Sequence, residues 1–292
     1  MNISGVINSL EDFEKLVEQT RFRRVESIGL NIPSRQEYYR GQLSSSWSIK
    51  PGLPRELKSA EAVVEAEKKI IDFFKEEMTK RSYTHKVLLH KNPRTHQNEW
   101  AWLTQAQHYR IPTRFLAWPL KPEVALYFAV EDSALDNVDG QFLIMYVSQS
   151  DFKTEETYQE EQYYDIPPTD IKETWFLNPC FYDLGEDNDT TAEIRRARQH
   201  GKFSLQPHEF SLKGLDEQNE FLHPWKKGTG TVIEKYIIPA KAKPQMRLDL
   251  ISKGWHGEYL YVNDDAVINE ITNGCKIILS DIIKRENAVA GK

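Results

Sequence analysis

The sequence is poor in cysteine, and it lacks any apolar run long enough to suggest a membrane span. Its two cysteines, Cys180 and Cys275, are too few for a disulfide framework and do not form a C-x-x-C pair. The first residues carry no basic stretch followed by an apolar core, so no secretory signal is predicted. These absences predict a cytoplasmic protein that does not bind a membrane.

The common motifs of phosphate, metal and ester chemistry are also absent. The sequence contains neither G-x-x-x-x-G-K-[ST] nor G-x-G-x-x-G, and it has no G-x-S-x-G nucleophile elbow. His85, His90 and His96 lie near one another without cysteines or regular ligand spacing, so no metal site is predicted. A net charge of -6 argues against a broad nucleic-acid footprint, and the best local basic patch is at 195–198.

Helix and strand patterns alternate irregularly along the 292 residues. This order favours an α+β fold, a single domain over 1–292 with a mixed, mostly antiparallel sheet core flanked by helices. The predicted helices begin at Ser9-Leu10 and near Pro122 and cover 60–80, 98–109, 191–200, 243–253 and 265–271, with an apolar segment at 276–283 that docks separately. The predicted strands cover 37–40, 141–147, 202–205 and 232–238, and 21–33 is predicted to be a connection.

The segment at 150–173 differs from the rest in its acidic character. Glutamates and aspartates cluster there around Glu160, together with Pro167-Pro168. We predict an exposed insertion or flexible segment within the domain. Three roles are left open for this segment, namely a lid, a site for a partner or a solvated surface. The acidic composition favours the solvated surface.

Two segments place polar and charged residues tightly between apolar ones, Tyr39-Arg40-Gly41-Gln42 and the stretch at 107–116. Buried polar groups must find partners or cost free energy, so the two segments predict a polar site in a cleft. The planar fork of Arg40 suits phosphate or ribose oxygens, and the alternative is a buried ion pair. Gly41 allows a ligand or another part of the chain to approach closely.

The second polar segment offers further candidates, each with a structural alternative. His108 and Tyr109 would stack on a ligand or bind it by hydrogen bonds, or His108 would bond a carbonyl at a helix end. Thr113 and Arg114 fall in a predicted loop, a usual place for site residues, and Arg114 could instead pair across the core. Trp118 fits a core position better than a stacking platform.

The order of several motifs along the chain resembles the FRG domain family, named for Phe-Arg-Gly, with Tyr39 here at the first position. Two departures are Arg110, where the family usually has Gly, and Ala117-Trp118-Pro119, where it usually has Asp-Trp-Thr. The resemblance spans most of the chain, about 3–271, and implies one FRG-type domain. Its motifs are Tyr39-Arg40-Gly41-Gln42 with Trp47, Pro51, Leu53 and Arg55; Gln107 to Trp118; Ala125 to Ala129; and Arg195, Gln199, Gly201 and Phe203.

The FRG motif order is itself similar to that of the ADP-ribosyltransferase superfamily. This similarity implies an ADP-ribosyltransferase-like fold and an enzyme that uses NAD as substrate to modify a nucleic acid or protein. Bacterial toxins and anti-phage effectors are the implied setting, with a cognate antitoxin or regulatory partner. The alternative is a non-catalytic module that binds a nucleotide or RNA in the same cleft.

The implied catalytic residues are Arg40 and Gln199. Gln199 occupies the place where the superfamily typically has a glutamate, and an amide supplies a hydrogen bond without the charge. Glu193, Glu209 and Glu258 are therefore open as the carboxylate. The implied NAD-binding residues are Tyr39, Gly41, Gln42, His108, Tyr109, Thr113, Arg114 and Trp118.

Overall fold

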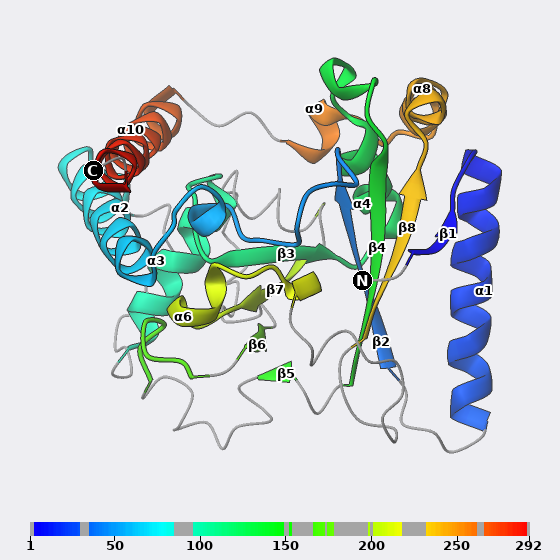
Figure 1. Cartoon of the computed structure of the whole chain (residues 1–292), viewed down its shortest axis with the longest axis horizontal. Coiled ribbons are helices and arrows are strands. Elements are labelled where there is room, and N and C mark those ends of the chain that lie inside the picture. The colour runs from blue at the N-terminus through cyan, green and yellow to red at the C-terminus, as the bar shows by residue number, and fades with distance from the viewer. Residues whose placement is uncertain are drawn as a thin grey trace.

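The computed structural model describes residues 3–29, 35–84, 96–148, 152–153, 166–172, 174–177, 198, 201–217, 232–261 and 266–290. These residues form an α+β fold in which strands and helices divide into two neighbouring halves (Figure 1). Within the described residues, no helix is both long and apolar enough to cross a membrane.

The first sheet has the strand order β1-β8-β4-β2. Its β1–β8 pair is parallel, and its other two pairs are antiparallel. The strands are β1 (Ile3–Val6), β8 (Val232–Ile238), β4 (Gly140–Ser148) and β2 (Arg35–Gln42).

The second sheet has the strand order β3-β7-β6-β5 and again one parallel pair, β5–β6. The expectation of a mixed, mostly antiparallel arrangement is confirmed, although the strands form two sheets where one core sheet was predicted. The strands are β3 (Phe115–Pro119), β7 (Gly201–Leu205), β6 (Trp175–Leu177) and β5 (Phe152–Lys153).

Helices cover one face of the first sheet. The packed helices are α1 (Leu10–Gly29), α4 (Pro122–Val130) and α8 (Lys243–Ser252). Phe13 of α1 meets Phe142 of β4 edge-on at 5.3 Å between ring centroids. Apolar side chains of the other face, including Leu143 and Met145, pack against Leu116 and Trp118 of β3, so this core layer joins the two sheets.

A second group of helices lies beside the second sheet, on the side of Figure 1 away from α1. It contains α2 (Ala60–Lys80), α3 (Gln97–His108) and α10 (Ala266–Ala290), whose apolar sides form one core. Phe74 of α2 meets Trp102 of α3 edge-on at 5.4 Å. The short helices are α6 (His208–Ser211), α9 (Gly257–Leu260), η1 (Leu53–Arg55), η3 (Ser133–Leu135), η5 (Leu215–Glu217) and η6 (Ala240–Ala242).

Two helices are longer than the sequence pattern predicts. The connection expected from Arg21 is wrong over its first part, because α1 continues to Gly29. The short helix and separate docking segment expected near the C-terminal end are one helix, α10. Gly274 lies inside α10, where a Cβ atom would meet the Phe73 ring at 2.6 Å. The glycine therefore allows α10 to approach α2 and does not end the helix.

Two other expectations fall wholly or largely on residues that the structure leaves undescribed. Of the helix predicted at 191–200, only Arg198 is described, and it is helical. Of the acidic segment at 150–173, the described parts are β5 and residues 166–172.

Candidate functional site

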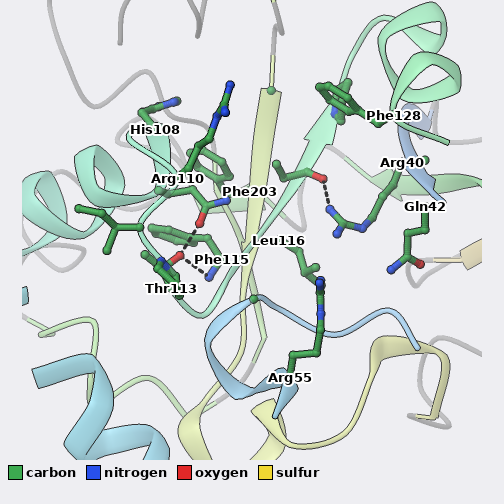
Figure 2. Close-up of a pocket in the computed structure, with 18 of the residues that line it drawn as sticks. Arg40, Gln42, Arg55, His108, Arg110, Thr113, Phe115, Leu116, Phe128 and Phe203 are labelled. Carbon is green, nitrogen blue, oxygen red and sulfur yellow. Dashed lines mark hydrogen bonds between the residues drawn. The ribbon is translucent and has the colours of Figure 1, made fainter. Parts of the chain in front are cut away.

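A cavity of about 430 Å³ lies where the two sheets approach each other (Figure 2). Its walls come from β2, the segment that follows β2, the end of α3 and the residues after it, β3, β7, α4 and the residues directly after α4 and α9. The lining residues are Arg40, Gly41, Gln42, Leu43, Trp47, Gly52, Arg55, Gln107, His108, Arg110, Ile111, Pro112, Thr113, Phe115, Leu116, Ala117, Pro119, Phe128, Glu131, Gly201, Phe203 and Tyr261.

The alternation of β2 divides the first polar segment between two faces of the sheet. Tyr39 faces the helices and stacks on Phe142 at 5.8 Å, and Gly41 faces α4. A Cβ atom at Gly41 would lie 1.8 Å from the carbonyl oxygen of Ala125. The close approach that Gly41 permits is therefore that of α4, and the strand continues through it to Gln42. Arg40 points the other way, toward the second sheet (Figure 2).

Arg40 donates one hydrogen bond within the described part of the chain and pairs with no acidic residue there. Its Nη1 donates to the carbonyl oxygen of Ala117 on β3 at 2.9 Å, while its buried Nε finds no hydrogen-bond partner among the described residues. Among the described residues, no carboxylate lies within ion-pair distance of Arg40, so the expected alternative of a buried ion pair is not what the structure shows. Burial, and next the charge of Arg55, lower the pKa of Arg40 to about 10. This guanidinium is a positive charge open to an anion.

Arg114 is buried outside the lining of the cavity and is fully engaged. Its Nε donates to both carboxylate oxygens of Glu67 at 2.9 and 3.0 Å, and its Nη2 donates to the Pro168 carbonyl at 2.7 Å. Nη1 donates to the carbonyl of Gln206, and His208 contacts Glu67 at 3.1 Å. Burial alone would raise the pKa of Glu67, but Arg114 and His208 hold it below its usual value. The structure therefore matches the expected alternative, an ion pair across the core.

Gln42 and Thr113 line the cavity, and their polar groups are already hydrogen-bonded within the protein. Gln42 accepts from Gln141 Nε2 at 2.6 Å and donates to the carbonyl of Ser48 at 3.3 Å. Thr113 Oγ1 donates to Gln107 Oε1 at 2.5 Å and accepts from the Phe115 amide at 3.1 Å (Figure 2). Both side chains thus fix the shape of the walls.

Arg110 occupies a strained position at the end of α3. Its φ is +60°, and the bonds from Arg110 N to the Gln107 carbonyl at 3.1 Å and from Ile111 N to the Ala106 carbonyl at 3.0 Å form a Schellman motif. Glycine suits this left-handed position best, because it has no side chain to collide with the backbone there. Arginine stays here at a conformational cost, with its guanidinium 4.2 Å from the centre of the Tyr261 ring.

Glu131 supplies a carboxylate to the cavity and lies directly after α4. Tyr261 OH donates to Glu131 Oε2 at 2.7 Å. Burial raises the pKa of Glu131, against the opposing effects of the Tyr261 hydroxyl and the charge of Arg110. Burial also raises the pKa of Tyr261, so its hydroxyl keeps its proton and remains a donor. The hydrogen bond from Tyr261 therefore fixes the orientation of the Glu131 carboxyl group in the cavity.

The structure brings Arg40, Gly41, Gln42, His108 and Thr113 together at the cavity. It places other predicted site residues elsewhere, in packed positions that do not line the cavity. Tyr39 and Arg114 are described above; Tyr109 meets Phe74 edge-on at 6.2 Å in the helical core; and the fully buried Trp118 donates to Ser204 Oγ at 3.0 Å. Gln199 lies outside the described residues, as does Glu193.

Several lining residues were not predicted as site residues. Trp47 and Arg55 stand in the first motif that resembles the FRG family, Arg110 was considered only as a departure from that family's pattern, and Phe128 was given no role in a site. Glu131 could have been singled out from the sequence, because an acidic residue just after the end of a helix interacts unfavourably with the helix dipole. Such a placement suggests that something other than helix stability retains the residue.

Comparison with known proteins supports one assignment. Residues 35–137 match the family model of the FRG domain. This match covers β2 through η3 and therefore the strand of Arg40, the end of α3, β3 and Glu131. No curated protein and no solved structure matches the chain.

Proposed function

We propose that the cavity binds a nucleotide through its phosphate groups, with NAD as the ligand. The observation that carries this proposal is the state of Arg40, whose buried Nε has no partner and whose charge meets no carboxylate among the described residues. A phosphate oxygen matches the donors of a guanidinium in charge and geometry. Arg55 and Arg110 add positive charge to the same walls.

The proposed reaction of bound NAD is transfer of ADP-ribose to a nucleic acid or protein, as expected of a bacterial toxin or anti-phage effector. The bond between C1′ of the nicotinamide ribose and the ring nitrogen breaks, and its electron pair leaves with nicotinamide. The acceptor forms the new bond to C1′ and releases a proton. Glu131 in its ionised form would accept that proton, and its raised pKa suits the role because a base works best near the operating pH.

Gln199 retains its proposed role as a hydrogen-bond partner of the ribose. The support for this role is indirect and comes from β7, since Gly201 and Phe203 both line the cavity.

A specific observation favours the alternative, a non-catalytic nucleotide- or RNA-binding module. At the two positions where the FRG family usually has Asp and Thr, the chain has Ala117 and Pro119, whose side chains bring no polar group to the cavity. Glu131 is then the one carboxylate among the described lining residues.

Binding is tested by calorimetry with NAD and ADP on the parent protein and on Arg40→Met. We expect the substitution to weaken binding about ten- to a hundredfold, the worth of a charged hydrogen bond. Arg285→Met is the control, because Arg285 forms an exposed 2.8 Å pair with Glu65 away from the cavity. A parent protein that binds neither ligand, or an Arg40→Met variant that binds as the parent does, would contradict the proposal.

Catalysis is tested with labelled NAD and separate pools of RNA, DNA and protein. Label that enters one pool with the parent, and is lost in Glu131→Gln while NAD still binds, supports the transferase. Binding of NAD without any transfer of label supports the non-catalytic module.

A further inference from the structure

Trp47 is an aromatic residue of the cavity wall that keeps much of its surface open. Its exposed fraction is 41%, whereas Phe115 and Phe203 on the same wall are exposed by 2% and 3%. Those two phenylalanines stack on each other at 4.9 Å with 23° between their planes. Those two rings are therefore largely enclosed by the protein, whereas Trp47 lines the same cavity and keeps exposed surface.

The backbone that carries Trp47 is fixed at several points. Gln141 Nε2 donates to the Trp47 carbonyl at 2.7 Å, and the Trp47 amide donates to the Ser44 carbonyl at 3.3 Å. On the other side, Asp216 Oδ1 accepts from Ser48 Oγ at 2.9 Å and from the amide of Ile49 at 2.8 Å. A ring presented from a fixed backbone loses less conformational freedom when a ligand binds.

The surroundings of Trp47 combine an aromatic face with positive charge. The Arg55 guanidinium lies 5.8 Å from the centre of the indole ring, and its charge also acts on Arg40. Figure 2 shows Arg55, which comes from η1, on the same cavity as Arg40. An aromatic platform beside two guanidinium groups fits a nucleotide, whose flat base is joined to its phosphates by one sugar.

We propose that Trp47 is the stacking platform for the adenine of the bound nucleotide, with Arg55 placed between this platform and the phosphate site at Arg40. The inference rests on the proposed function and adds which part of the nucleotide contacts which residue: the base contacts Trp47, and the phosphates contact Arg40 and Arg55. A ligand that carries phosphates without a base would use Arg40 and Arg55 alone.

The test compares ADP with pyrophosphate, which lacks the base, by calorimetry on the parent, Trp47→Ala and Trp47→Phe. We expect Trp47→Ala to weaken ADP binding about tenfold, the usual scale of base stacking. Its affinity for pyrophosphate should be unchanged, and Trp47→Phe should retain most ADP affinity. Phe210→Ala is the control, since Phe210 is 45% exposed and does not line the cavity.

The outcomes separate this inference from the function on which it rests. If the parent binds neither ADP nor pyrophosphate, the phosphate site itself is wrong. If the parent binds both and Trp47→Ala weakens neither, or weakens both equally, the stacking role alone is overturned. ADP should also quench part of the tryptophan fluorescence of the parent, and Trp47→Phe should lose that part.

Discussion

Arg40 and Arg114 are both arginines beside β3, since Arg40 donates to Ala117 of that strand and Arg114 directly precedes it, yet their surroundings differ in almost every respect. Arg114 is fully buried and directs its guanidinium at Glu67 and two carbonyl groups. Within the described part of the chain, Arg40 has one carbonyl partner and a buried Nε without any. The two arginines thus differ most in their partners: a carboxylate pairs with Arg114, and none of the described carboxylates pairs with Arg40.

The largest effect should come from Arg114→Ala. We expect it to lower the free energy of unfolding by about 3–5 kcal/mol, because it leaves the Glu67 carboxylate buried with His208 as its remaining side-chain partner. Urea denaturation measures the change. Arg40→Met should change stability by no more than about 1 kcal/mol, because no buried carboxylate loses a partner. Equal losses in both variants would erase the distinction between the two arginines.

A smaller effect is expected at Gly41, the neighbour of Arg40 in the chain. Gly41→Ala should destabilise by about 1–3 kcal/mol, because the added Cβ atom collides with the Ala125 carbonyl of α4. Gly52→Ala is a matched control on the same cavity, where a Cβ atom would meet nothing within 4 Å and stability should change by less than about 0.5 kcal/mol. Thermal unfolding of both variants checks this. A Gly41→Ala protein as stable as the parent would show that α4 can shift to accommodate the added methyl group.

The smallest effect concerns a third arginine, Arg110, whose backbone is strained. Arg110→Gly and Arg110→Ala both remove the guanidinium that lies over Tyr261, so their difference isolates the left-handed backbone. We expect the glycine variant to be more stable than the alanine variant by about 1 kcal/mol. Denaturation midpoints measured side by side decide the matter. Equal midpoints would mean that the position carries no such strain.

The sequence allowed good prediction wherever the signal was local. The apolar positions of α2, such as Val63, Ile70 and Phe74, repeat at helical spacing, and the helix was predicted with its observed bounds, 60–80. The strand at 232–238 was likewise predicted as observed. The full length of α10 was not predicted, because its packing against α2, including the close contact of Gly274 with Phe73, joins residues that are far apart in the chain.

The candidate site was predicted in part for the same reason. Arg40 and His108 were found because each stands in a dense polar motif. The pairings that decide the other roles join distant residues: Glu67 and Arg114 are 47 positions apart, and Glu131 and Tyr261 are 130 apart. No local pattern contains such pairs, so Arg114 was taken for a ligand-binding candidate and Glu131 was missed.

The contact between Arg40 and β3 uses the main-chain oxygen of Ala117, which every amino acid possesses. A change of side chain at 117 therefore leaves the link between the two sheets in place. Such a change would alter the shape and acidity of the hollow without removing the bond that holds the arginine facing it.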